Sequence, residues 1–260
     1  MGDPRPGGLP QPDLASRRVV LGEIFALWLV TLLLIRGVKD LVGTVGLPEV
    51  FLAAVPILFM YAPVFLCRLR GVDSWDYPLA LPAFRDREAW WGAVKLTLMV
   101  IAVVTVPWLI GYHVYQTTLF PWAVEALGLG TAPDYHYRGT WPAQPLLLVG
   151  YHVFFVAIPE EFFYRGYLQT RLDEAFPPRW RILGADLGWG WLLACVFFAL
   201  GHSLVEPQWW HFAIFFPSLV FGWMRARTGG IVAGALFHAW ANIGVTTLDT
   251  LYGVVPVSPG

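Results

Sequence analysis

The sequence has few charged residues. Of its 260 residues, 13% are charged and 57% are hydrophobic, whereas about a quarter of the residues of a soluble domain are charged. This composition excludes an ordinary soluble domain and indicates a polytopic membrane protein in a lipid bilayer. The 14 Trp and 10 Tyr agree with it, because both residue types prefer membrane interfaces. The formal net charge of −1 offers no excess of cations to a phosphate backbone, so we expect no nucleic-acid partner.

Cysteine and the common protease signatures are also scarce or missing. Cys67 and Cys195 lie at or within apolar runs and form no CxxC pair, so we expect small buried side chains and no disulfide framework. The sequence contains neither HExxH nor GxSxG, which argues against a zinc-protease helix and a serine nucleophile elbow. Two His and two Glu would suit zinc by type, but without that spacing we predict no metal site and no cofactor.

The long apolar runs predict an all-α fold, a bundle of about seven to eight transmembrane helices. We place seven spans, at residues 19–35, 50–67, 90–112, 145–169, 187–202, 209–224 and 231–251. Within the loop at 113–144, residues 119–129 are expected to form a short interfacial helix. Lys and Arg concentrate in alternate loops, which predicts a cytoplasmic N-terminus. We expect the membrane to be a bacterial or archaeal cytoplasmic membrane.

Three charged residues lie at the end of the apolar run that begins at Pro145. They are Glu160, Glu161 and Arg165. Each ionised side chain near the centre of a bilayer costs roughly 2.5–3.5 kcal/mol, so these groups must be paired or used. Glu161 and Arg165 are four residues apart and share a helical face, as Glu160 and Tyr164 do. A structural ion pair between Glu161 and Arg165 remains an alternative to a role at a site.

Two further pairs have the same four-residue spacing. Phe198 precedes His202, and His238 precedes Asn242. Each pair should present its side chains on one helical face. His152 and His211 stand outside such pairs and are expected to be ordinary core histidines.

These polar residues permit hydrolysis by a carboxylate-activated water. Glu160 would take the proton and His202 would orient the water, while His238 and Asn242 would donate hydrogen bonds to the developing oxyanion. Two neighbouring buried acids cannot easily both hold a charge, which suits Glu160 beside Glu161 to general-base work. The reaction would be peptide hydrolysis.

The three motifs carry a family resemblance. EExxxR at 160–165, FxxxH at 198–202 and HxxxN at 238–242 together resemble the CAAX-protease and bacteriocin-processing (CPBP, Abi) family of intramembrane glutamic endopeptidases. The resemblance covers about residues 145–251. It implies a water-filled intramembrane cavity formed by the last four spans, Glu160 as the base with His202 as its partner on the water, and His238 and Asn242 as the oxyanion site.

The resemblance also implies supporting roles and a substrate class. Glu161 and Arg165 would support the catalytic residues, together with Phe198 and Tyr164. The partner would be a membrane-associated or lipidated protein or peptide, as in family members that remove a tripeptide from prenylated CAAX proteins. A prenylated tail, a leader peptide and a sorting anchor all remain open as substrates.

The chain is accordingly divided into four regions. We expect a disordered cytoplasmic tail at 1–16, N-terminal spans and a long loop at 17–144, a CPBP-like catalytic core at 145–252 and a C-terminal tail at 253–260. Two alternative functions keep the same intramembrane acids. One is a non-catalytic scaffold or immunity protein, and the other is a proton-coupled carrier, although no internal repeat is visible.

One geometric difficulty follows from the predicted spans. With straight helices and about 1.5 Å per residue, Glu160 and His238 lie about 20 Å below the outer face, whereas His202 lies near that face. Residues that act on one water cannot be so far apart. We therefore expect the span at 187–202 to stop short and residues 203–208 to be recessed into the membrane, where irregular backbone is tolerated beside a watery cavity. A distance above about 8 Å between Glu160 and His202 would contradict the mechanism.

Overall fold

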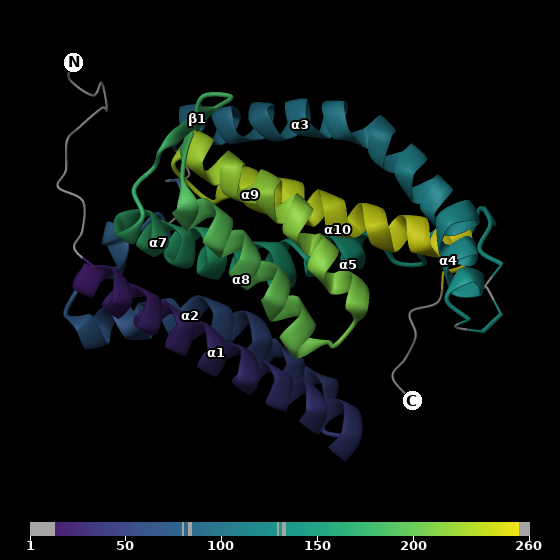
Figure 1. Ribbon diagram of the computed structural model, residues 1–260, viewed down its shortest axis with the longest axis horizontal. Helices are drawn as coiled ribbons and strands as arrows, with labels where there is room; N and C mark the ends of the chain where they lie inside the picture. The colour runs from purple at the N-terminus through teal and green to yellow at the C-terminus, as the bar shows by residue number, and fades with distance from the viewer. Residues whose placement is uncertain (1–13, 80, 83–84, 129, 132–133, 255–260) are drawn as a thin grey trace.

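Helices account for nearly all of the regular structure. The computed structural model describes residues 14–79, 81–82, 85–128, 130–131 and 134–254 (Figure 1). Within these ranges the exceptions are two short antiparallel strands, β1 (Trp180–Ile182) and β2 (Ala185–Leu187), in which Trp180 pairs with Leu187. The predicted all-α bundle is confirmed.

The first two long helices form one side of the bundle. α1 (Leu14–Val45) and α2 (Ala54–Arg70) pack against each other at the bottom of Figure 1, with a 3₁₀ turn at Glu49–Ala53 between them. α1 begins inside the segment 1–16 that we expected to be a tail, and residues 1–13 lie outside the described part. Glu23 of α1 accepts hydrogen bonds from Tyr167 and Arg171 and pairs with Arg70. This Glu23 cluster joins α1 and α2 to the fourth long helix.

The third helix is longer than the sequence predicted. After a 3₁₀ turn at Ser74–Asp76, α3 (Arg87–Val114) continues through a π-helical segment (Tyr115–Leu119) into α4 (Phe120–Ala126). The predicted loop start at 113 is therefore wrong. α4 lies within the short helix predicted at 119–129, but it continues from α3 instead of standing apart. Residues 115–119 include no Gly or Pro, so the helix changes its hydrogen-bond spacing there instead of ending. Figure 1 shows the run bending toward α4.

The helix that carries Glu160 is also interrupted by π-helical segments. It consists of α5 (Pro145–Gly150), a π segment (Tyr151–Ala157), α6 (Ile158–Glu161), a second π segment (Phe162–Gln169) and α7 (Thr170–Ala175). Pro159 has no backbone N–H to donate to the preceding turn, as expected from its place before the two glutamates. π segments occur frequently at functional sites, and here they flank both acids.

Three more helices complete the bundle. They are α8 (Trp189–Val205), α9 (Phe215–Thr228) and α10 (Val232–Tyr252), with a 3₁₀ turn at Trp209–Ile214 before α9. α9 packs against both α8 and α10, and α8 also contacts α1. The buried core between them includes Phe163, Leu168, Phe198, Phe221 and Phe237.

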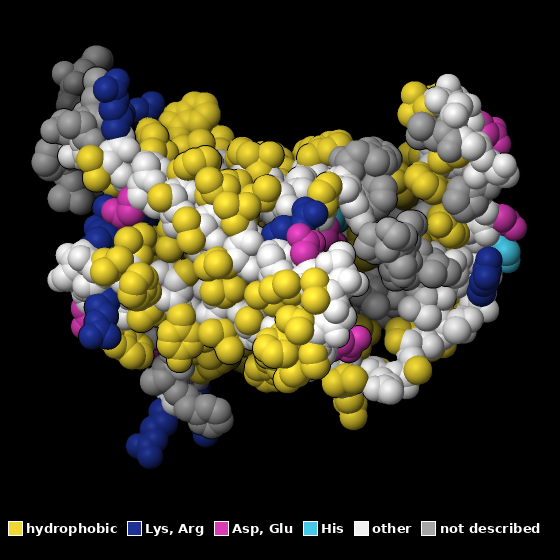
Figure 2. Space-filling model, turned by 90° about the horizontal axis from the view of Figure 1, so that it is seen from below, with side chains coloured by type: hydrophobic (Ala, Val, Ile, Leu, Met, Phe, Trp, Pro, Cys, Tyr) yellow, Lys and Arg dark blue, Asp and Glu magenta, His cyan; other side chains and the backbone are white. Residues whose placement is uncertain are grey.

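The surface of the bundle fits a membrane protein. Four helical runs are long and apolar enough to cross a membrane, namely Ser16–Val45, Glu49–Arg70, Arg87–Ala126 and Pro145–Ala175, and α8 is a shorter apolar helix. Hydrophobic side chains cover much of the face seen in Figure 2. The count of seven spans and the cytoplasmic N-terminus stay predictions.

Candidate active site

Glu160 faces two histidines that come from two other helices. Its Oε2 lies 3.8 Å from Nε2 of His202 in α8 and 3.8 Å from Nε2 of His238 in α10. The Glu160 side chain is 14% exposed, and Oε2 is buried without a hydrogen-bond partner among the described residues. Both distances exceed a direct hydrogen bond and suit a single water that contacts more than one of these atoms.

The two histidine rings are oriented by their other nitrogens. His202 Nδ1 lies 3.0 Å from the backbone oxygen of Phe198, one turn earlier in α8. His238 Nδ1 lies 3.1 Å from Oε1 of Glu161. Because these partners are acceptors, each Nδ1 carries the ring proton, and Nε2 of each neutral ring is left as an acceptor toward Glu160.

Glu161 and Arg165 form a fully buried ion pair. Nη1 of Arg165 lies 3.2 Å from Oε1 of Glu161, and both side chains are 0% exposed. Arg165 also donates through Nη2 to Ser218, at 2.8 Å to the hydroxyl and 3.3 Å to the backbone oxygen. Glu161 is thus held between Arg165 and His238. It forms the predicted ion pair with Arg165 and also contacts a histidine that faces Glu160.

Aromatic side chains enclose this pair. The guanidinium carbon of Arg165 lies 4.2 Å from the centre of the Phe198 ring and 5.2 Å from that of Phe221. Phe198 also packs edge-on against Tyr164 and contacts the rings of both His202 and His238. Cations are attracted to ring faces most strongly where water is excluded. Phe198 therefore covers the buried guanidinium and packs against both histidines.

The remaining predicted residue, Asn242, follows the cluster along α10. Asn242 is half-buried, one turn beyond His238 in α10. His152 is half-buried, and its Nε2 lies 3.3 Å from the Thr246 hydroxyl while its Nδ1 is buried without a partner in the described chain. His211 contacts the backbone oxygens of His202 and Glu206.

The structure brings His202 beside Glu160, while the recession of the segment after α8 into a membrane stays a prediction. α8 continues to Val205, so residues 203–205 are helical and the predicted end of this span at 202 is wrong. In Figure 1, α8 ends well short of the right-hand end of α10, and residues 206–208 connect it to the following 3₁₀ turn. His202, near the C-terminal end of α8, therefore lies beside Glu160. The distance of 3.8 Å is well within the 8 Å limit set above.

Two residues at the site had no signal in the sequence. Ser218 of α9 is buried against Arg165, and Gly234 of α10 lies so close that an added Cβ would be 2.9 Å from Oε2 of Glu161. Neither residue belongs to a recognisable sequence motif. Their importance comes from contacts between different helices.

Other possible binding features lie elsewhere or are not seen. In the described ranges, no group of three or more His, Cys, Asp or Glu side chains is arranged to hold a metal ion.

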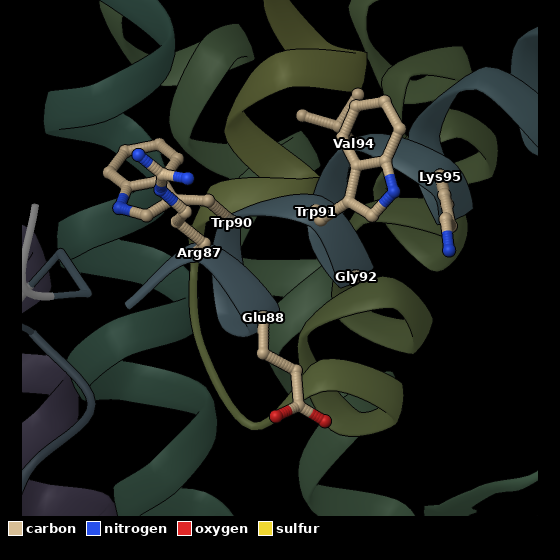
Figure 3. A pocket seen from close by; sticks show the side chains of 7 residues that line it. All are labelled: Arg87, Glu88, Trp90, Trp91, Gly92, Val94 and Lys95. Carbon is tan, nitrogen blue, oxygen red and sulfur yellow. The ribbon is translucent and has the colours of Figure 1, made fainter. Parts of the chain in front are cut away.

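A pocket of about 930 Å³ adjoins the first turns of α3, and a second of about 700 Å³ lies between α3 and α9. Figure 3 shows Arg87 and Trp90 on one side of α3 and Trp91 and Lys95 on the other. Neither pocket is lined by Glu160, His202 or His238.

Comparison with known proteins places this site within a family match. Residues 142–244 match the family described as type II CAAX prenyl endopeptidase Rce1-like. No curated protein and no solved structure matches the chain. The matched segment includes all three motifs. The resemblance to the CAAX-protease and bacteriocin-processing family is thereby confirmed, and residues 142–244 are Rce1-like.

Proposed function

We propose that the protein is an intramembrane endopeptidase that hydrolyses a peptide bond of a membrane-associated or lipidated protein with a water activated by Glu160. The match to a CAAX prenyl endopeptidase family supports endopeptidase activity of the CAAX-protease type in general. The observation that carries the glutamate mechanism is the approach of Glu160 Oε2 to two histidine Nε2 atoms, at 3.8 Å each.

Glu160 Oε2 and the Nε2 atoms of His202 and His238 are three hydrogen-bond acceptors that face one another. They require a hydrogen-bond donor between them. A water between Glu160 and His202 can donate one hydrogen to the Glu160 carboxylate and the other to His202 Nε2. Its free lone pair then points toward a substrate carbonyl. As the water oxygen attacks the carbonyl carbon, Glu160 accepts the proton. Glu160 returns that proton to the leaving nitrogen when the C–N bond breaks.

The oxyanion of the intermediate needs donors. The side-chain amide of Asn242 can supply one as an N–H. His238 can supply another through Nε2 only when its ring is doubly protonated, because Nδ1 already donates to Glu161. Glu161 and Arg165 are positioning residues in this scheme, since they hold the His238 ring and do not face the water.

The test is cleavage by the full chain in liposomes. The first substrate is a farnesylated peptide that ends in a CAAX sequence. In a second experiment, the termini of membrane proteins are compared with and without active enzyme. We expect Glu160→Gln and His202→Ala each to lower cleavage by at least about a hundredfold while the protein still folds and inserts. Glu125→Gln, which changes an exposed glutamate of α4, is the matched control. Normal cleavage by Glu160→Gln would refute the mechanism, and a biological role that survives this substitution would favour a scaffold.

A further inference from the structure

The groove of about 700 Å³ between α3 and α9 has no role in the proposed mechanism. Leu96 and Met99 of α3 form part of one wall, and Trp223 and Arg227 of α9 form part of the other. Leu183, in the turn between β1 and β2, also lines it. Figure 1 shows β1 beside the beginning of α3. The groove therefore lies between three segments that are far apart in the sequence.

The groove is apolar apart from one cation. Arg227 is the only charged residue among the described residues that line it. Its side chain is exposed, and neither an ion pair nor a hydrogen bond joins it to another described residue. Arg225, two residues earlier, is by contrast paired with Asp173 at 3.1 Å. The larger pocket at the first turns of α3 differs, because Glu88 contributes a carboxylate to it (Figure 3). Only the groove thus offers a cation without an acid beside it.

The indole of Trp223 adds apolar surface. Its Nε1 donates to the backbone oxygen of Ile182 at 2.9 Å, so the polar atom of this side chain is already satisfied. The wall opposite is equally open, since a Cβ added to Gly92 would meet no atom within 4 Å. A hydrocarbon chain could therefore lie directly against α3.

The length and direction of the groove fit one leaflet of a bilayer. Its α3 wall runs from Ala89 to Met99, which is about 15 Å along a helix. Half of a hydrocarbon core of about 30 Å has the same depth. Arg227 is in the last turn of α9 and Ala89 is in the first turn of α3, so the cation borders the end of the groove at which α3 begins. Met99 lies at the other end.

We propose that this groove binds an anionic phospholipid of the surrounding membrane, with its phosphate at Arg227 and an acyl chain along Leu96 and Met99. Basic pockets between membrane helices bind the head groups of anionic lipids, and the apolar wall supplies the contact for the chain. The proposal does not depend on the proposed function, because it concerns a site that Glu160, His202 and His238 do not line.

A first test measures the preference for an anionic head group. The full chain in detergent micelles is titrated with phosphatidylglycerol or with phosphatidylcholine that has identical acyl chains, and bound lipid is counted by native mass spectrometry. We expect binding of phosphatidylglycerol at an about fivefold lower concentration, because the phosphatidylcholine head group has no net charge. Arg227→Gln should bind both lipids equally. Arg179→Gln, which changes an exposed arginine that does not line the groove, should keep the preference. A preference that persists in Arg227→Gln, or that Arg179→Gln removes as well, overturns the site.

A second test fills the groove. Gly92→Leu places a side chain in the open space, and we expect it to weaken the binding of phosphatidylglycerol by at least about tenfold. Gly111→Leu is the matched control, because Gly111 is an exposed glycine of the same helix with equally open space around it. Phosphatidylglycerol should raise the unfolding temperature of the wild-type chain and of Gly111→Leu, but not that of Gly92→Leu. Unchanged lipid binding by Gly92→Leu overturns the site. Displacement of the lipid by a farnesylated peptide also overturns it, since the groove would then hold a substrate chain.

Discussion

Arg165→Met should strongly destabilise the protein, because it leaves a buried carboxylate without its cation. At the observed 3.2 Å between Nη1 and Glu161 Oε1, the attraction is about 5 kcal/mol at an effective dielectric constant of 20. Arg165 also loses its hydrogen bonds to Ser218 and its contact with the Phe198 ring. Removing one partner of a buried ion pair costs about 3–5 kcal/mol, and we expect a loss in this range. His238 alone then contacts Glu161, so cleavage falls as well.

The measurement is reversible unfolding in mixed detergent micelles, followed by circular dichroism. The cycle of Arg165→Met, Glu161→Gln and the double variant isolates the pair, and the double variant should lose less stability than Arg165→Met alone. Arg181→Met is the control, because Arg181 faces Asp186 at 3.8 Å on an exposed surface, where ion pairs contribute about 0–1 kcal/mol. A loss below about 1 kcal/mol for Arg165→Met, or no coupling in the cycle, would refute the reasoning.

Three further predictions concern the surroundings of the site and its chemistry. Gly234→Ala places a Cβ 2.9 Å from Glu161 Oε2, and we expect the displaced carboxylate to lower kcat by about a hundredfold; Gly230→Ala, with open space around it, should not change the rate. Glu23→Gln weakens the Glu23 cluster, and a loss of about 1–3 kcal/mol should appear in thermal unfolding in detergent, whereas unchanged stability would contradict a structural role for the cluster. A strong chelator should leave peptide cleavage unchanged, and loss of activity that Zn²⁺ restores would replace the glutamate mechanism with a metal-dependent one.

The contacts within a single helix could be predicted well. The four-residue spacing places Arg165 beside Glu161, and the structure shows that ion pair. The same spacing places Phe198 beside His202, and their rings lie 4.6 Å apart. Such pairs follow from helical geometry alone, which the two π segments around the acids alter only locally.

Contacts between helices could not be predicted in the same way. That Glu161 orients His238, and that Ser218 binds Arg165, depends on how α9 and α10 cross the helix of Glu160. Helix tilt, the early end of α8 and the rotation of each helix about its axis are set by side-chain packing over the whole bundle. The assumption of straight spans therefore placed His202 too far from Glu160.

By itself, the sequence determined that this is a helical membrane protein with three polar motifs, because low charge, long apolar runs and residue spacing are local properties. Only the tertiary structure decided that these motifs meet. Glu160 contacts the histidines of α8 and α10 because those helices end and pack where they do. The tertiary structure also brings together His152 and Thr246, which lie on two different helices. These residues are 94 positions apart in the sequence, so no helical spacing could predict their contact.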